Sequence, residues 1–332
     1  MATLRDVARQ AGVSVATASR VVSGLENVRS ETRERVERAM RELLYVPPGR
    51  RPATGVIGLL VPDLANPIFP ALAQAMEKHA TEAGLASILC STTSAAFREV
   101  EYVHMLLDRR VDGMIFISCE MTNLSGEHDH YARLVEDGAR IVFVNGALNT
   151  LNVPSVGVDE RLAGESATQH LLDLGHRRVG YVAGPAYYLP TRQKAAGRES
   201  ALRAAGLEPD GLVAHGDFSV EGGRAALREL LARDVRPTGV ICSSDLMAIG
   251  ALQEAAAQGI RVPEDLSVVG FDGIDATRWT KPPLTTVDQP IEEIAETAVN
   301  ALRSLIEEPA KPLPDSIFRP RLTLRGSTAA PG

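Results

Sequence analysis

The chain has 332 residues, of which 45% are hydrophobic and 23% charged, and its formal net charge at pH 7 is −7. This length suits one small domain plus a larger one, and the apolar content is enough for sizeable cores. There is no basic-then-apolar leader and no apolar run of membrane length, so we expect a cytoplasmic protein that does not bind membranes. The three cysteines and seven histidines show no CxxC or HExxH spacing, so neither a disulfide nor a metal site is predicted.

Two short helices joined by a tight turn are predicted within residues 3–22. The first helix has its apolar residues at the spacing of one helix face: Leu4, Val7, Ala8 and Ala11. Gly12 should end that helix, because glycine readily adopts the left-handed conformation that helix ends often need. Ser14 is expected to cap the second helix, since its hydroxyl can accept a hydrogen bond from a free backbone amide.

A third helix is predicted over 30–44, with Ser30 as its cap. In a helix-turn-helix unit the second helix enters the major groove of DNA with its first residues near the base edges. Residues 1–54 contain ten Lys and Arg against six Asp and Glu, a net charge of +4, which leaves −11 for the rest of the chain. This asymmetry indicates a small module that binds a polyanion, joined to an acidic body. A three-helix scaffold that binds protein is the alternative, because helical periodicity is common.

Strands and helices alternate from Val56 onward. Continuous apolar runs of strand length are typical of parallel strands that are buried on both faces. Strands are predicted at 56–61, 86–91, 113–118, 140–144, 178–183, 238–243, 267–271 and 320–324. Helices are predicted at about 68–83, 98–109, 127–137, 160–174, 193–205, 219–232, 245–258 and 290–307. This order predicts an α/β protein with parallel sheets and right-handed crossovers.

The body is predicted to form two lobes, because its strands are too many for one ordinary open sheet and the pattern breaks near 154–159. Open parallel sheets bind ligands at the carboxyl ends of their strands. The cleft between two such lobes is therefore the expected ligand site. No G-x-S-x-G, Walker or strand-following G-x-G-x-x-G sequence occurs, so neither an enzyme nor a bound cofactor is predicted.

Several sequence motifs together carry a family resemblance. The run T-L-x-D-V-A-x-x-A-G-V-S-x-x-T-x-S-R-V begins at Thr3, and L-x-Y-x-P ends at Pro47. Further motifs include V-P-D-L-A-N-P-I-F at 61–69, L-G-H-R-R-V-G-Y-V-A-G-P at 174–185 and V-V-G-F-D at 268–272. In these motifs the chain resembles the lactose/galactose-repressor family of bacterial transcription regulators, over nearly its whole length.

The resemblance implies an α/β core of two Rossmann-like lobes, similar to periplasmic sugar-binding proteins, with a small all-α helix-turn-helix domain at the N-terminus. In that architecture the chain crosses between the lobes three times, and we place the crossings near 158, 289 and 319. The predicted domains are a helix-turn-helix domain at 1–46, a short Pro/Arg linker at 47–55, an N-terminal lobe at 56–158 plus 290–318, and a C-terminal lobe at 159–289 plus 319–328.

The residues that follow the capping serine tune operator choice in this family, and here they are Val15 and Ala16. Both can offer apolar contact to a thymine methyl group, and Arg20 can contact guanine in a bidentate manner or bind phosphate. The alternative is that Arg20 is merely solvated. The candidate DNA-binding residues are Thr3, Ser14, Val15, Ala16, Thr17, Ser19, Arg20, Asn27, Tyr45, Arg50 and Arg51.

The linker departs from the family pattern. Family members fold a short hinge helix on operator DNA and insert its leucine into the minor groove, but residues 48–55 contain prolines and glycines and no leucine. We therefore expect no leucine wedge. One hypothesis is that 48–52 lies extended in the minor groove and inserts Arg50 and Arg51. The other is that this segment is a stiff, solvated spacer.

The effector is expected to contact polar and aromatic side chains near the ends of strands. Asp272 ends a predicted strand, and its carboxylate can accept hydrogen bonds from sugar hydroxyls. Lys194 stands where the family has an arginine, so the planar guanidinium clamp is lost. Asn66 precedes a proline and has helix capping as its alternative role. The candidate effector-binding residues are Asn66, Phe69, Asn145, Asp159, Arg192, Lys194, Phe218, Ser244, Asp272 and Gln289.

The predicted function is therefore that of a ligand-responsive repressor of carbohydrate-utilisation genes. It would bind double-stranded, palindromic operator DNA as a homodimer and take a small sugar-like effector in the cleft between its lobes. A purine effector and a solute-binding protein for transport are the alternatives.

Overall fold

The computed structural model describes residues 4–22, 28–43, 54–92, 96–209, 211–309 and 311–332. The chain divides into two compact units, Met1–Thr54 and Gly55–Gly332. Among the described residues, no helix combines the length and the apolar character that crossing a lipid bilayer demands.

The N-terminal unit contains three helices, α1 (Leu4–Ala11), α2 (Val15–Val22) and α3 (Ser30–Glu42). Gly12 ends α1 with a φ of +61°, as its position in the sequence predicts. The amide of Val13 then donates to the carbonyl of Ala8 at 2.9 Å, which closes the turn. The helices bury a small shared core: Val7, Ala8, Ala11, Ala18, Val21, Val36 and Ala39.

The start of α3 corrects one detail of the prediction. Ser30 is the first helical residue, so it does not occupy the capping position. The carbonyl of Arg29 instead accepts hydrogen bonds from the amides of Thr32 and Arg33, both at 3.0 Å. Arg29 is therefore the residue that flanks the helix.

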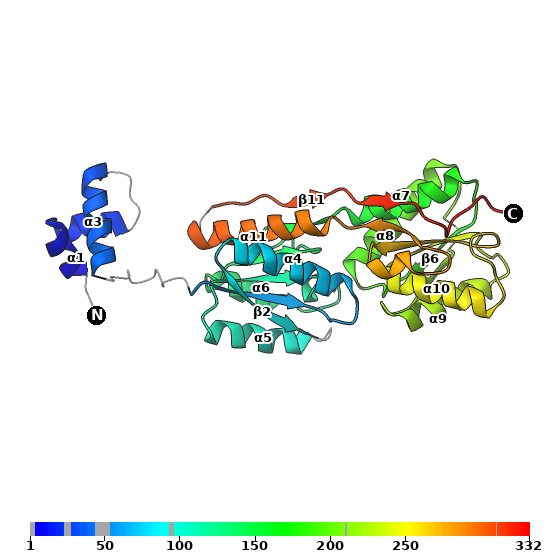
Figure 1. Ribbon diagram of the computed structural model, residues 1–332, viewed down its shortest axis with the longest axis horizontal. Coiled ribbons are helices and arrows are strands. Elements are labelled where there is room, and N and C mark those ends of the chain that lie inside the picture. The colour runs from blue at the N-terminus through cyan, green and yellow to red at the C-terminus, as the bar shows by residue number, and fades with distance from the viewer. Residues whose placement is uncertain (1–3, 23–27, 44–53, 93–95, 210, 310) are drawn as a thin grey trace. The chain divides into compact units, whose positions relative to one another are not determined.

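The first lobe of the larger unit is a six-stranded parallel sheet in the order β11-β5-β4-β3-β1-β2. Its strands are β1 (Val56–Val61), β2 (Ala86–Ser91), β3 (Gly113–Ile117), β4 (Ile141–Val144), β5 (Ser155–Val158) and β11 (Ser316–Phe318). Its helices are α4 (Ile68–Glu82), α5 (Ala96–Asp108), α6 (Asp129–Glu136) and α11 (Ile291–Glu307). In β3, Ile115 packs with α4 and α11 whereas Phe116 packs with α5 and α6, so the two helix pairs cover opposite faces. Figure 1 shows α11 lying along α4.

The second lobe is a six-stranded sheet in the order β12-β10-β9-β8-β6-β7. Its strands are β6 (Val179–Ala183), β7 (Val213–His215), β8 (Gly239–Cys242), β9 (Ser267–Asp272), β10 (Thr285–Asp288) and β12 (Arg321–Thr323). Its helices are α7 (Glu160–Asp173), α8 (Leu189–Ala204), α9 (Val220–Leu231) and α10 (Asp245–Ala257). In β8, Val240 packs with α9 and α10 whereas Ile241 packs with α7 and α8. Short 3-10 helices lie at Glu120–Thr122 in the first lobe and at Asp275–Arg278 in the second.

Sheet membership changes at three places along the chain. β5 ends at Val158 and α7 begins at Glu160; β10 ends at Asp288 and α11 begins at Ile291; β11 ends at Phe318 and β12 begins at Arg321. Each lobe is therefore assembled from separate stretches of sequence.

Residues close to the C-terminus complete the second lobe. The hydroxyl of Ser327 donates to the carbonyl of Val268 at 2.6 Å and accepts from the amide of Thr285 at 2.8 Å. The amide of Ala329 donates to the hydroxyl of Ser267 at 3.0 Å. The strands β9 and β10 are thus tied to the segment that follows β12.

Helices α7 and α8 approach each other at two glycines. A Cβ atom at Gly197 would lie 2.0 Å from the carbonyl oxygen of Arg161, and one at Gly164 would lie 2.2 Å from that of Lys194. Both clashes involve backbone atoms, so a side chain at either position would force the helices apart. This close contact fixes α8, and with it Lys194, against the start of α7.

The two-lobed α/β class is confirmed, with three differences from the predicted elements. The strands β5, β7, β10 and β11 were not predicted. β12 runs antiparallel to β10, so the second sheet is not wholly parallel. α8 begins at Leu189, four residues before the predicted start, because Pro190 fits the first turn of a helix.

Candidate functional site

The first candidate site is the exposed face of α2. The hydroxyl of Ser14 accepts a hydrogen bond from the amide of Thr17 at 3.1 Å, so the predicted cap is confirmed. The side-chain hydroxyls of the same two residues are 2.8 Å apart and share a hydrogen bond. Ala18 and Val21 face the core. The opposite face of α2 leaves Val15, Ala16 and Arg20 exposed, and Val15 is 44% exposed despite being apolar.

Five predicted DNA-binding residues lie outside the described residues. They are Thr3, Asn27, Tyr45, Arg50 and Arg51. The described part of this candidate surface therefore runs from Ser14 to Arg20.

Arg35 of α3 fixes the turn between α1 and α2, and the sequence pattern gave no reason to select it. Its Nη2 donates to the carbonyl of Ala11 at 2.5 Å and to that of Gly12 at 3.2 Å. A Cβ atom at Gly12 would lie 2.7 Å from the same nitrogen, so the glycine also leaves room for this guanidinium. This role could not be predicted from the sequence, because Arg35 is distant in sequence from the turn and is one of several arginines on its helix.

Replacing Arg35 with alanine should destabilise the N-terminal unit. The change leaves two helix-end carbonyls without their donor, a loss of about 1–3 kcal/mol. We expect faster proteolysis within the N-terminal unit and weaker operator binding, while the melting temperature of the two-lobed core stays constant. Arg38→Ala is the matched control, because it removes the same charge from an exposed position of the same helix. Equal behaviour of the two variants would assign the effect to charge alone.

The second candidate site is a cavity of about 600 Å³ between the two lobes. Most of its walls follow the carboxyl ends of strands: Asp63 after β1, Ser118 after β3, Asn145 after β4 and Ser243 after β8. This is the location that parallel sheets predict. The lining includes eight of the ten predicted effector residues: Asn66, Phe69, Asn145, Lys194, Phe218, Ser244, Asp272 and Gln289.

Asp159 and Arg192 do not line this cavity. The carboxylate of Asp159 caps α7 by accepting from the amide of Leu162 at 2.8 Å. Arg192 is exposed, and its Nε donates to the carbonyl of Ala186 at 2.9 Å. Both side chains therefore make local hydrogen bonds, and their positions in the sequence did not reveal this.

A chain of side-chain hydrogen bonds joins the two lobes across the floor of the cavity. Nδ2 of Asn145, after β4, donates to Oε1 of Gln289 at 2.9 Å. Nε2 of Gln289 in turn donates to Oδ1 of Asp272, at the end of β9, at 2.8 Å. Gln289 thus connects one residue from each sheet, and it does so instead of capping α11, whose flanking residue is Pro290.

Asp272 has the most unusual environment in the cleft. It is 5% exposed, and its φ of +125° is a strained conformation for a residue with a side chain. Its second carboxylate oxygen, Oδ2, is buried and makes no hydrogen bond. Burial, followed by the nearby carboxylate of Asp245, raises the pKa of Asp272 well above its usual range. A buried acceptor without a partner, on a residue that lines the cavity, points to a ligand that donates hydrogen bonds.

Lys194 is paired with a residue that sequence reasoning missed. Its ammonium group forms a buried ion pair with the carboxylate of Glu160, the first residue of α7. The same ammonium lies 3.7 Å from the ring centroid of Phe271, over its face. Burial raises the pKa of Glu160, while Lys194 opposes that shift. Because Glu160 neutralises Lys194, this ammonium group does not present an unpaired positive charge to the cavity.

Two predicted residues combine a structural role with a place in the lining. The hydroxyl of Ser244 accepts from the amide of Met247 at 3.3 Å and so caps α10. Oδ1 of Asn66 is 3.4 Å from the amide of Ile68, a weak contact, and the helix-flanking residue of α4 is Pro67. Asn66 therefore contacts the start of α4 and also lines the cavity, so both of its predicted roles stay open.

The aromatic part of the lining was predicted only in part. Phe69 and Phe218 line the cavity as predicted, but Tyr187 and Tyr188 line it as well. The two tyrosine rings have centroids 4.8 Å apart, and the ring of Tyr188 is 5.8 Å from that of Phe218. Adjacent tyrosines in a chain with only six tyrosines were the signal that could have identified this pair.

Known proteins resemble this chain along nearly its whole length. Residues 3–48 match "Bacterial regulatory proteins, lacI family", and residues 168–328 match "Periplasmic binding protein-like domain". A Streptomyces limosus protein named "Uncharacterized HTH-type transcriptional regulator in aml 5'region" is 43% identical, over 98% of this chain and 94% of its own length. The chain belongs to the lacI family of bacterial regulatory proteins.

Other lacI family proteins agree with this assignment. The HTH-type transcriptional regulator MalR of Streptomyces coelicolor is 39% identical, over 99% of this chain and 97% of its own length. The solved transcriptional regulator CelR-cellobiose complex has a TM-score of 0.76 and 32% identity, and covers 98% of this chain and 100% of that chain. The lac repressor dimer bound to operator and the anti-inducer ONPF has a TM-score of 0.73 and 29% identity, with 99% of each chain covered. These names agree with the prediction of a lacI family regulator that is not an enzyme.

Proposed function

We propose that this lacI family protein is a sugar-responsive repressor. It binds a palindromic operator as a homodimer through the exposed face of α2, and it takes a neutral sugar between its lobes. The observation that carries the effector part of the proposal is the buried, unpartnered Oδ2 of Asp272 inside the cavity. Sugar hydroxyls supply the hydrogen-bond donors that this oxygen requires.

The charges in the cavity support a neutral effector. Lys194 is already neutralised by Glu160, and Asp272 is a further acidic group, so a phosphorylated or carboxylated ligand would meet no free cation among these three residues. The aromatic lining of Phe69, Tyr187, Tyr188 and Phe218 suits the apolar C–H faces of a sugar ring. A relative is known as a complex with cellobiose, which is a neutral sugar.

The lobes provide a route from the effector to DNA. Residues of both lobes line the cavity, so a ligand that binds one relative orientation of the lobes more tightly shifts the protein toward it. In a dimer, such a change alters the spacing of the two α2 helices over the half-sites. The solved lac repressor dimer on its operator, a relative of 29% identity, supports both the dimer and the DNA target.

A ligand screen tests the effector class. We expect sugars, and not nucleobases, to raise the melting temperature of the full chain, since a ligand that binds the folded state stabilises it. Each hit is then added to an operator-binding titration at one fixed salt concentration. A purine hit in the absence of any sugar hit would contradict the sugar assignment. A sugar hit that does not change operator affinity would contradict the coupling.

Arg50 and Arg51, which lie outside the described residues, remain part of the proposal as minor-groove contacts. Replacing both with alanine should weaken operator binding and flatten the preference for A·T pairs at the operator centre. Operators with A·T-rich and G·C-rich centres measure this preference. A uniform, salt-sensitive loss on both operators would support the solvated spacer instead.

A further inference from the structure

The cleft has two chemically different ends. At one end Lys194 pairs with Glu160, and both of them affect the pKa of the nearby Asp272. At the other end the rings of Tyr187, Tyr188 and Phe218 follow one another. Burial raises the pKa of Tyr188 to about 12, and the nearby Tyr187 and Glu120 add to this shift. The aromatic end is formed by the two tyrosines that precede α8 and by Phe218 after β7, whereas Asp272 ends β9 and Glu160 begins α7.

The aromatic end is joined to a loop of the opposite lobe. The amide of Leu124, which follows β3 in the first lobe, donates to the carbonyl of Tyr187 at 2.8 Å. Asn123 and Tyr188 form an isolated antiparallel β-bridge. Tyr187 and Tyr188 precede α8 of the second lobe, so these backbone contacts connect the two lobes beside the cavity.

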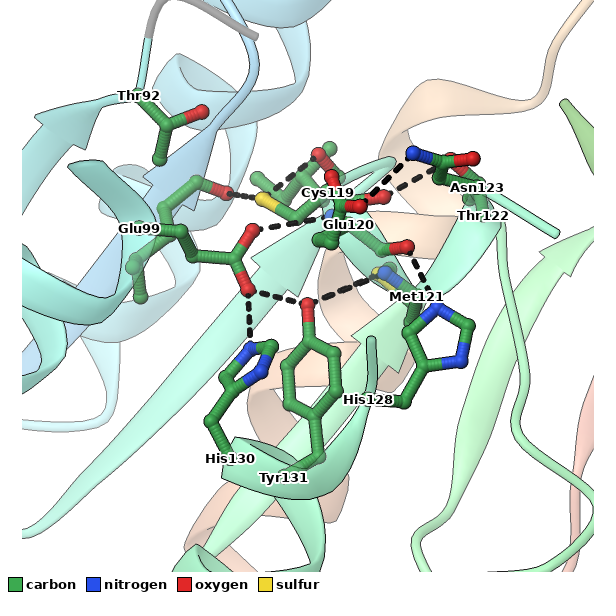
Figure 2. Close-up of polar contacts among 12 residues, drawn as sticks. Thr92, Glu99, Cys119, Glu120, Met121, Thr122, Asn123, His128, His130 and Tyr131 are labelled. Carbon is green, nitrogen blue, oxygen red and sulfur yellow. Dashed lines mark hydrogen bonds and ion pairs between the residues drawn. The ribbon is translucent and has the colours of Figure 1, made fainter. Parts of the chain in front are cut away.

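A buried carboxylate in the first lobe holds that loop. Glu99 of α5 is 1% exposed, and its Oε2 accepts from the amide of Glu120 at 3.0 Å. Its Oε1 accepts from the hydroxyl of Tyr131 and lies 3.0 Å from Nε2 of His130. Tyr131 in turn accepts from the amide of Met121 at 3.2 Å. Figure 2 shows these side chains converging beneath the loop, so the core of the first lobe sets its position.

We propose that Tyr187 and Tyr188 form an outer subsite that binds the second ring of a disaccharide, and that the loop carrying Asn123 and Leu124 holds this subsite in place. The first ring occupies the Asp272 end. This inference rests on the proposed sugar effector. Tyr187 is 43% exposed, so its ring retains surface that a ligand can bury. A cavity of about 600 Å³ lies within the range that admits ligands larger than a single sugar ring.

Calorimetric titration of the full chain with cellobiose, maltose and glucose tests the subsite. We expect Tyr187→Ala and Tyr188→Ala to weaken binding of the preferred disaccharide by about tenfold, because a stacked ring contact is lost. Binding of glucose should be unchanged, since one ring reaches only the Asp272 end. Tyr188→Phe is the matched control; it keeps the ring and should retain most of the disaccharide affinity.

A second pair of variants tests the loop without touching the aromatic rings. Leu124→Pro removes the amide that donates to Tyr187, whereas Leu124→Ala keeps it. Asn123 already has an extended backbone, with φ −83° and ψ 104°, which suits a residue before proline. The Leu124 side chain is 43% exposed, so its loss alone should have little effect. We expect the proline variant to lose disaccharide affinity selectively and the alanine variant to match the wild type.

The outcomes separate the subsite from the proposed function. Equal losses for glucose and disaccharide in the tyrosine variants, or no loss for either, would overturn the outer subsite while leaving the sugar effector in place. A wild-type protein that binds neither disaccharide would overturn the subsite, and the sugar assignment falls with it only if no sugar of the wider screen binds either. A selective loss of disaccharide binding in Tyr187→Ala, Tyr188→Ala and Leu124→Pro, with Tyr188→Phe and Leu124→Ala unaffected, establishes the proposal.

Discussion

Asp272→Asn should weaken effector binding by about a hundredfold while operator binding in the absence of effector is retained. The amide keeps one oxygen, which can still accept from Gln289, but it replaces the unpartnered carboxylate oxygen with a donor. A hydrogen-bond donor of the ligand that is buried without its acceptor costs about 1–3 kcal/mol, and the upper part of this range corresponds to the expected loss of affinity. Asparagine tolerates positive φ better than most residues, so the backbone at this position is preserved. Calorimetry with the preferred sugar, followed by operator titration, measures both effects.

The same variant should be more stable than the wild type at neutral pH. The pKa of Asp272 is raised in the folded protein, so folding favours the protonated carboxyl. The wild type therefore loses stability as the pH rises from the ordinary aspartate range, about 4, through the folded-state pKa. Asparagine has no such loss, so its advantage in melting temperature should appear at neutral pH and vanish in acid.

Asp217→Asn is the matched control for both measurements. Asp217 also lines the cavity, but it is exposed and accepts a hydrogen bond from Ser219. The change removes the same charge from the same cleft without relieving a buried carboxylate. A stability gain in this control as large as that of Asp272→Asn would contradict the assigned role of burial.

Arg20→Ala should weaken operator binding by about tenfold to a hundredfold and relax the base preference at one position of each half-site. A bidentate arginine–guanine contact contributes about 1–3 kcal/mol of discrimination, and Arg20 lies on the exposed face of α2. Fluorescence anisotropy with operators substituted one base pair at a time measures the affinity and the specificity together. The two-lobed core should keep its melting temperature and its response to the effector.

Arg20→Lys separates a base contact from a phosphate contact. Lysine keeps the charge but lacks the planar fork, so a base contact should be lost in both variants. A phosphate contact would instead survive in the lysine variant. If Arg20 contacts phosphate, the alanine variant should lose the same operator affinity on every DNA sequence. The slope of log affinity against log salt concentration should then decrease by about one.

The fold was predictable where the residues of one continuous segment show the hydrophobic pattern of a strand or a helix. The apolar runs of β1, β3 and β6 and the helices between them are continuous in sequence, and these elements were predicted to within a few residues. β5, β7, β10 and β11 were missed because they are short and each contains a polar residue, so none forms the continuous apolar run that marked β4. In β10, two threonines are fully buried because neighbouring strands pair on both sides, and that pairing is not encoded locally.

The candidate site shows the same division. Asp272 and Phe218 were predictable from their places at strand ends and from the family resemblance. The pairing of Lys194 with Glu160 was not, because it depends on the close approach of α7 and α8 at Gly164 and Gly197. The Glu99 network likewise brings together α5, α6 and the loop after β3, so no motif spacing marks it.

The late position of β11 and β12 in the sequence determines the order in which the units can fold during synthesis. The three N-terminal helices pack on one another within residues 4–43, so all the residues of their shared core are made before the strands of either lobe. The first sheet lacks β11 until Phe318 is made, and the second lacks the contacts of Ser327 and Ala329 until those residues are made. A growing chain therefore completes its DNA-reading unit well before either lobe can close around an effector. Premature termination upstream of β11 should give products that carry the reading helix without a regulated core.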